Sequence, residues 1–168
     1  YQPNTADAKA VAGANIVFVN GLGFETWSDA LINNAGGDAS VIVATVGVEP
    51  ILVDGEIDPH AWNALTNGVI YVENISAAMA AADAGNADAY KANAASYIAK
   101  LRALHAGAAD RFGSLPEDGR TVVTAHDAFG YLADSYGLNF LAPVGIDTEA
   151  EPSASELAAL IAHLKETG

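Results

Sequence analysis

The stretch "NADAYKANAASYIAKLRALHAGAADRF", residues 86 to 112, reads as one uninterrupted α-helix around which the rest of the chain is organised. Its apolar and small side chains recur at helical spacings: Tyr90, Tyr97, Leu101, Leu104, Ala108 and Phe112. About 27 residues at about 1.5 Å each give a helix of roughly 40 Å, which spans a whole molecule of this size. We therefore predict a rigid linking helix over residues 86–114, followed by the turn "GSLPEDGR".

Strands alternate with helices on both sides of this long helix. Before it, the β-branched runs "NIVFVNG" and "SVIVATV" are typical of buried strands, and the helical stretch "ETWSDALINNAGG" lies between them. After it, "TVVTA" and "NFLAPVGI" read as strands around the short helix "HDAFGYLADSYG". Strand, helix and strand in succession favour parallel pairing. The predicted fold class is α/β, with two α/β lobes that contain parallel sheets and are joined by the long helix.

This pattern divides the chain into three parts. Residues 1–85 form the N-terminal lobe, which also holds a helix capped by Thr5 that runs to Ala12 and a longer helix before Gly85. Residues 86–114 are the linking helix, and residues 115–168 begin the C-terminal lobe. The chain opens inside a loop-to-helix transition and closes on a helix, so we expect the first strand of one lobe and part of the other to lie outside it.

Composition narrows the classes of function. The 168 residues are 51% hydrophobic and 17% charged, which describes a folded globular protein. The formal net charge of −14 repels nucleic acid and anionic membrane surfaces, so we expect neither as a partner. No run of about 18 apolar residues predicts a membrane span. The sequence has no cysteine, so any metal ligand must be His, Asp, Glu or water.

The sequence contains neither a complete nucleotide-binding glycine motif nor the nucleophile motif of serine hydrolases. "VNGLGFE", residues 19 to 25, has Gly-Leu-Gly after a strand, but it lacks the third glycine of a dinucleotide fingerprint and the lysine of a phosphate loop. A tight turn between strand and helix is the better interpretation. The nucleophile elbow G-x-S-x-G of serine hydrolases is absent from the sequence.

Two of the four histidines stand where ligands gather. His126 directly follows an apolar strand, and ligands of open α/β sheets collect at the carboxyl ends of strands, although a polar turn would explain it too. His60 lies in "EIDPHAWN", residues 56 to 63, where Asp58 is a candidate ligand but more simply a hydrogen-bond acceptor or a turn residue. His105 and His163 lie within helices and read as ordinary helix histidines. We predict His60 and His126 as ligands of a divalent transition metal.

Several motifs together resemble the zinc and manganese receptors among the solute-binding proteins of ATP-binding-cassette importers. "YQPNTADAKAVAGANIVFVNGLGFETW" resembles the segment that follows the family's first ligand, a histidine two positions before the tyrosine. "DPHAW" resembles the second-ligand motif, carried by His60, and "HDAFGYLADSYGL" resembles the third, carried by His126. "GIDTEAEPSASEL" resembles the loop that comes next. The resemblance runs along nearly the whole chain.

The resemblance implies a high-affinity receptor that holds Zn²⁺ between its lobes and delivers it to an importer permease. A histidine at the third position goes with zinc and a glutamate with manganese, so His126 favours Zn²⁺ over Mn²⁺. The remaining ligands, a histidine before Tyr1 and an aspartate after Gly168, would lie outside this chain. The resemblance further implies a monomer, periplasmic or lipid-anchored at the cell surface, with a metallochaperone as a second candidate partner.

In this interpretation Asp58 orients the loop, Pro59 fixes the approach of His60, and Trp62 packs beneath the imidazole. Zinc is captured rather than used, so we predict no enzyme activity. The alternatives are a manganese receptor of the same family and a metal-dependent hydrolase with His60 and His126 as ligands and Asp58 or Glu56 as base. An adhesin or interaction module that kept the fold and lost the metal is a third alternative.

Overall fold

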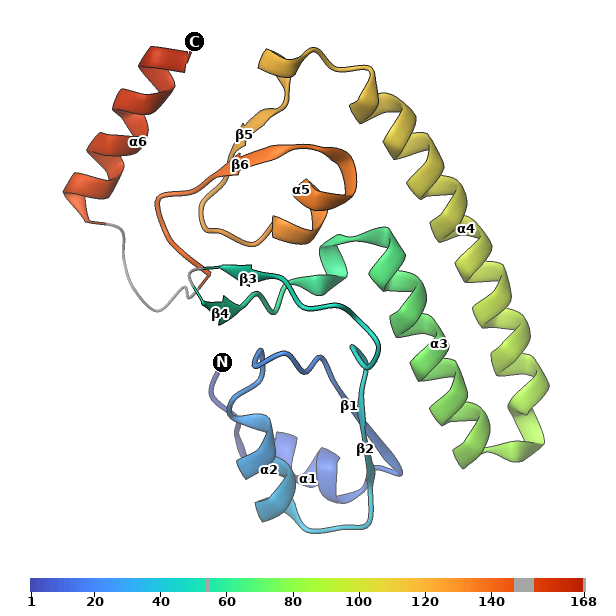
Figure 1. Ribbon diagram of the computed structural model, residues 1–168. Helices are drawn as coiled ribbons and strands as arrows, with labels where there is room; N and C mark the ends of the chain where they lie inside the picture. Colours follow the sequence, from blue (N-terminus) through green and yellow to red (C-terminus); the bar gives the residue numbers. More distant parts are fainter. Residues whose placement is uncertain (54, 147–152, 168) are drawn as a thin grey trace.

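The computed structural model describes residues 1–53, 55–146 and 153–167, and it places a small α/β unit at each end of one long helix (Figure 1). The first unit consists of α1 (Thr5–Ala12), β1 (Ile16–Val19), α2 (Ser28–Ala35) and β2 (Ser40–Val43). Its two strands pair in parallel, with Ile16 opposite Ser40 and Val19 opposite Val43. The predicted parallel α/β arrangement is therefore confirmed for this unit.

A hairpin and a pair of helices connect the two units. They comprise β3 (Leu52–Val53), β4 (Glu56–Ile57), the 3₁₀ turn η1 (Ala61–Asn63), α3 (Leu65–Ala82), the 3₁₀ turn η2 (Ala84–Asn86) and α4 (Ala87–Gly113). The helix α4 matches the predicted long helix, and it packs alongside α3 while it extends from one unit to the other (Figure 1). Gly68 on α3 faces Leu101 of α4, since a Cβ there would lie 3.6 Å from Leu101 Cδ1, an ordinary van der Waals contact.

The second unit follows the 3₁₀ turn η3 (Glu117–Gly119) and repeats the parallel arrangement. It contains β5 (Thr121–Val123), α5 (Gly130–Tyr136) and β6 (Asn139–Leu141), and the helix α6 (Ala154–Thr167) comes after it. Thr121 pairs with Asn139 and Val123 with Leu141, in parallel register. The stretch "GIDTEAEPSASEL", which resembles a loop of the family, includes residues 147–152, and these lie outside the described residues.

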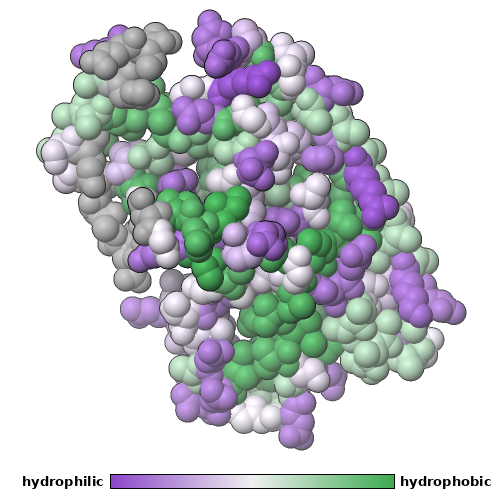
Figure 2. All heavy atoms as spheres, viewed as in Figure 1, coloured by the Kyte–Doolittle hydropathy of each residue, from purple (hydrophilic) through white to green (hydrophobic). Residues whose placement is uncertain are grey.

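Three local predictions were wrong. Asn4, not Thr5, caps α1, because its side chain accepts from the Ala6 N–H while Asp7 completes a capping box. Residues 56–57, expected to lie in a loop, form strand β4, which pairs antiparallel with β3. The strand β2, expected to be buried, exposes Val41 and Val43. Its sheet has only two strands within the described residues, and Figure 2 shows apolar surface in that region.

The main buried cluster lies where the hairpin, α3 and α5 meet. It consists of Val48, Ala61, Ala64 and Tyr131. Beside it the side chain of Asp58 is completely buried. Gly130, the first residue of α5, packs against this carboxyl group, since a Cβ at that position would lie only 2.8 Å from Asp58 Oδ2. The core therefore joins residues from both halves of the chain.

The packing of α4 on α3 predicts unequal costs for two leucine truncations. Leu101→Ala should lower the free energy of unfolding by about 2 to 4 kcal/mol, because Leu101 is buried against α3. Leu104→Ala, at a position that is 59% exposed on the same helix, should change it by less than about 0.5 kcal/mol. Urea denaturation of both variants checks this, and equal losses would contradict the packing.

The close approach of Gly130 to Asp58 predicts that alanine is harmful there. Gly130→Ala should destabilise the fold by about 1 to 3 kcal/mol through overpacking. The matched control is Gly107→Ala, because a Cβ at Gly107 on α4 meets nothing within 4 Å. That substitution should stabilise the helix by about 0.5 to 1 kcal/mol. The midpoint temperature of thermal unfolding should fall for Gly130→Ala and rise for Gly107→Ala. A rise for both variants would show that a Cβ fits at Gly130.

Candidate metal site

His60 lies in the loop between β4 and η1, where its imidazole is held by a buried carboxyl group. The residue is only 6% exposed. Asp58 Oδ1 accepts two hydrogen bonds from it, one from the His60 backbone N–H at 2.9 Å and one from ring Nδ1 at 2.8 Å. A carboxylate oxygen only accepts, so Nδ1 carries the ring proton and the Nε2 lone pair is available to a metal. The acceptor role predicted for Asp58 is seen in this contact.

His126 approaches from the second α/β unit. It follows strand β5, and its backbone carbonyl accepts a hydrogen bond from Thr124 Oγ1 at 3.1 Å. The imidazole centroids of His60 and His126 are 5.4 Å apart, and the ring planes are tilted by 59°. The structure thus brings together the two histidines that the sequence singled out, although they are far apart in the chain.

Asn20 anchors the His60 loop to the N-terminal unit. Its side-chain amide donates to the carbonyl of Pro59 at 3.1 Å, and its Oδ1 accepts from the hydroxyl of Tyr71. Its backbone carbonyl accepts from Thr45 Oγ1 at 2.6 Å. Burial, with Tyr131 and Glu25 nearby, raises the pKa of Tyr71 to about 12, so this hydroxyl remains a donor at neutral pH. Asn20, directly after β1, therefore links the segment after β2, the helix α3 and the residue before His60.

The Gly-Leu-Gly segment is the tight turn that was predicted. Gly21, Leu22 and Gly23 all have positive φ, at 83°, 56° and 80°. Only glycine fits at Gly21, because a Cβ there would lie 2.5 Å from Val43 Cγ1. The carboxylate of Glu25 accepts from the backbone N–H groups of Asn20 at 2.6 Å and Gly21 at 3.1 Å. These N–H groups are thus occupied within the turn.

Two aromatic rings lie close to the His60 imidazole. The ring of Trp62 lies 5.3 Å from that of His60, and Phe24 lies 4.9 Å from Trp62 and 6.4 Å from His60. Trp62 is 41% exposed, so it stands beside the imidazole at the surface rather than beneath it as predicted. The buried support under His60 comes from Asp58 instead.

The other histidines do not join this pair within the described part of the chain. His105 Nδ1 contacts the hydroxyl of Tyr136 at 3.0 Å, which fits its interpretation as a helix histidine. The side chain of His163 lies outside the described residues. Glu56, a candidate base, is exposed on β4. Across residues 1–53, 55–146 and 153–167 no three His, Asp or Glu side chains gather as a metal site, so His60 and His126 stand as a pair.

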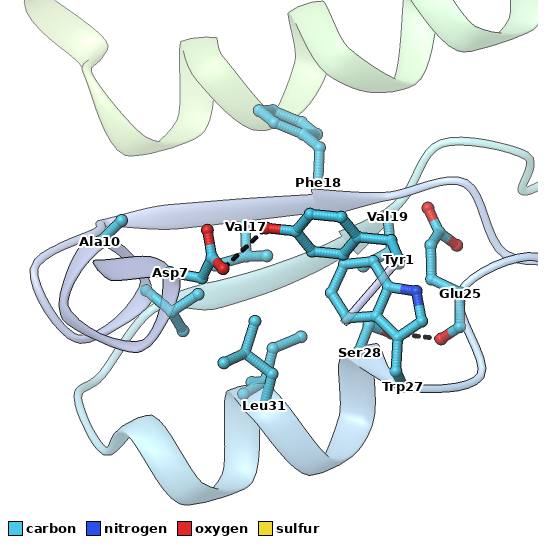
Figure 3. A pocket seen from close by; sticks show the side chains of 12 residues that line it. Tyr1, Asp7, Ala10, Val17, Phe18, Val19, Glu25, Trp27, Ser28 and Leu31 are labelled. Atoms are coloured by element: carbon cyan, nitrogen blue, oxygen red, sulfur yellow. Dashed lines mark hydrogen bonds between the residues drawn. The ribbon is translucent and has the colours of Figure 1, made fainter. Parts of the chain in front are cut away.

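A separate hollow of about 230 Å³ lies between α1, β1 and α2 (Figure 3). The rings of Tyr1 and Trp27 pack at its edge with centroids 5.1 Å apart, and the Tyr1 hydroxyl donates to Asp7 at 2.7 Å. This hydrogen bond raises the pKa of Tyr1 and lowers that of Asp7. The hollow is lined mainly by apolar side chains and includes neither histidine of the pair.

Sequence reasoning missed two residues that support the site, Asn20 and Tyr131. The Asn-Gly pair after β1 indicated only a turn, and Tyr131 was part of a predicted short helix without a role of its own. None of the described helices is both long enough and apolar enough to cross a membrane.

Comparison with known proteins places these features in a family. The metal ABC transporter substrate-binding lipoprotein FimA of Streptococcus parasanguinis is 33% identical over 178 residues, which cover 99% of this chain and 58% of the relative. The manganese ABC transporter substrate-binding lipoprotein PsaA of Streptococcus pneumoniae is also 33% identical, with 99% and 57% covered. The chain therefore spans less than two thirds of the length of these relatives.

Solved structures agree in fold. The periplasmic zinc binding protein TroA from Treponema pallidum superposes with a TM-score of 0.92 at 26% identity, covering 99% of this chain and 62% of TroA. A manganese-bound mutant of a periplasmic metal binding protein from Candidatus Liberibacter asiaticus gives 0.87 at 32% identity, covering 99% and 63%. The family model described as zinc-uptake complex component A, periplasmic, matches residues 1–168. The chain belongs to this family, ZnuA.

Proposed function

We propose that this chain carries two ligands of a metal receptor that captures a divalent transition metal and delivers it to an ABC importer permease. The observation that supports this most strongly is the approach of His60, beside η1, and His126, in the second α/β unit, to a ring separation of 5.4 Å. Asp58 leaves Nε2 of His60 as the unprotonated nitrogen. Two imidazoles are too few for a tight site, so further ligands must come from outside the described residues.

Zinc is the metal that we propose, ahead of manganese. Imidazole nitrogen is a favoured ligand of Zn²⁺, whereas Mn²⁺ sites rely more on carboxylate and water oxygens. The pair contributes two imidazoles, and the carboxyl group that hydrogen-bonds to the His60 ring, that of Asp58, is turned to Nδ1. The names of similar proteins do not decide between the two metals, since TroA is named for zinc and PsaA for manganese.

The metal is cargo in this proposal, and the protein is not an enzyme. We place it outside the cytoplasmic membrane, in the periplasm or lipid-anchored at the surface, as the names of its relatives support. A hydrolase would keep a position open for substrate and would turn over esters or phosphate esters with a rate abolished by His126→Ala. We expect no such turnover.

The test of the metal site is chelator competition with Zn²⁺ and Mn²⁺ on the longest natural form of the polypeptide. Wild-type protein should bind one Zn²⁺, more tightly than Mn²⁺, and His60→Ala and His126→Ala should each weaken zinc binding by more than about tenfold. The control His105→Ala removes a histidine outside the pair. A preference for Mn²⁺ would move the protein to the manganese receptors, and unchanged binding in both site variants would place the metal elsewhere.

The contact between Asp58 and His60 predicts an indirect contribution to affinity. Asp58→Asn keeps the size of the side chain but weakens the hydrogen bond that it accepts from His60 Nδ1. Zinc affinity should therefore fall by roughly tenfold. Asp83→Asn is the matched control, because Asp83 accepts hydrogen bonds from Asn86 and Tyr90 between α3 and α4. Competition titrations should separate the two variants, and equal affinities would show that Asp58 only shapes the loop.

A further inference from the structure

Two side chains tie the loop of His60 directly to the segment that carries His126. The hydroxyl of Tyr131 donates to the backbone carbonyl of Asp58 at 3.0 Å and accepts from the Ile51 N–H at 3.1 Å. The side-chain amide of Asn63 donates to the backbone carbonyl of Ala128 at 2.7 Å. These bonds join positions 65 to 80 residues apart in sequence. They therefore connect the hairpin and η1, which hold His60, to the second unit, which holds His126.

The bond from Tyr131 to Asp58 is buried and the other two are partly buried, and the residues that they hold lie close to both histidines in the sequence. Tyr131 and Ala128 are each 4% exposed, and Tyr131 belongs to the main buried cluster. Asp58 comes two residues before His60 and Ala128 comes two residues after His126. A hydrogen bond shielded from water is stronger than an exposed one, and the group left behind when it breaks is costly. Separating the two histidines would require breaking these bonds.

We propose that Tyr131 and Asn63 are positioning residues that form a latch, which holds His60 and His126 at one spacing whether or not metal is bound. This inference rests on the proposed function, since it assumes that the two imidazoles bind the metal. The pair then acts as a preorganised half-site, so the cost of arranging two ligands is met when the protein folds. Closure of the lobes would bring the remaining ligands to this pair and would not change the distance within it.

Two matched pairs of substitutions test the latch. Tyr131→Phe removes the hydroxyl that binds the Asp58 carbonyl, whereas Tyr136→Phe removes the hydroxyl of another buried tyrosine of α5, which contacts His105 instead. Asn63→Ala breaks the bond to Ala128, whereas Asn67→Ala breaks a bond to Ala61, within the first half of the chain. Zinc affinity, zinc dissociation rate and thermal stability are measured for all four variants in the longest natural form of the polypeptide.

The latch predicts that Tyr131→Phe and Asn63→Ala each weaken zinc binding by roughly tenfold, mainly through faster dissociation. The zinc affinity of the two control variants should stay within about twofold of wild type. This should hold even where their thermal stability falls as much as that of Tyr131→Phe and Asn63→Ala. If the wild type binds zinc and the latch variants match their controls, the latch is overturned while the receptor function stands. If the wild type binds neither Zn²⁺ nor Mn²⁺, the function fails and the latch with it. Should Tyr131→Phe not fold, the asparagine pair decides the outcome.

Discussion

The candidate site depends on Asp58, whose side chain is completely buried. One of its oxygens accepts from the backbone and the ring of His60, while its backbone carbonyl accepts from Tyr131. Its other oxygen, Oδ2, is buried without a hydrogen-bond partner among the described residues and lies against Gly130. A buried carboxyl oxygen that lacks a partner costs free energy. That cost fits a residue kept to orient a ligand rather than to stabilise the fold.

The loop of residues 58–60 is thus held from two sides. Asn20 binds the Pro59 carbonyl from the N-terminal unit, and Tyr131 binds the Asp58 carbonyl from α5. The helix α4 runs between the two units and packs on α3 along the way (Figure 1). The histidines face each other where these supports converge. A site assembled this way places its ligands on a scaffold that the metal does not have to build.

The sequence predicted those features that depend on local pattern. Helical periodicity located α4, β-branched runs located the parallel strands, and position after an apolar strand singled out His126. The sequence could not predict which side chains far apart in the chain form hydrogen bonds with each other. Nothing local distinguishes Tyr131, which binds the loop of His60, from Tyr136, five residues later on the same helix. Whether Val41 is buried depends on the neighbours of its strand in the folded protein. The choice of Asn4 over Thr5 as the N-cap depends on which residue is the first with helical backbone angles.

The most direct measurement is X-ray absorption at the zinc edge on the zinc-loaded longest natural form of the polypeptide. The spectrum should show at least two imidazole nitrogens at about 2.0 Å from the metal, recognisable by multiple scattering from the rings. One imidazole should disappear from the spectrum of His60→Ala, and likewise from that of His126→Ala. A wild-type spectrum without imidazole, or one that neither substitution changes, would contradict the assignment of these two histidines as ligands.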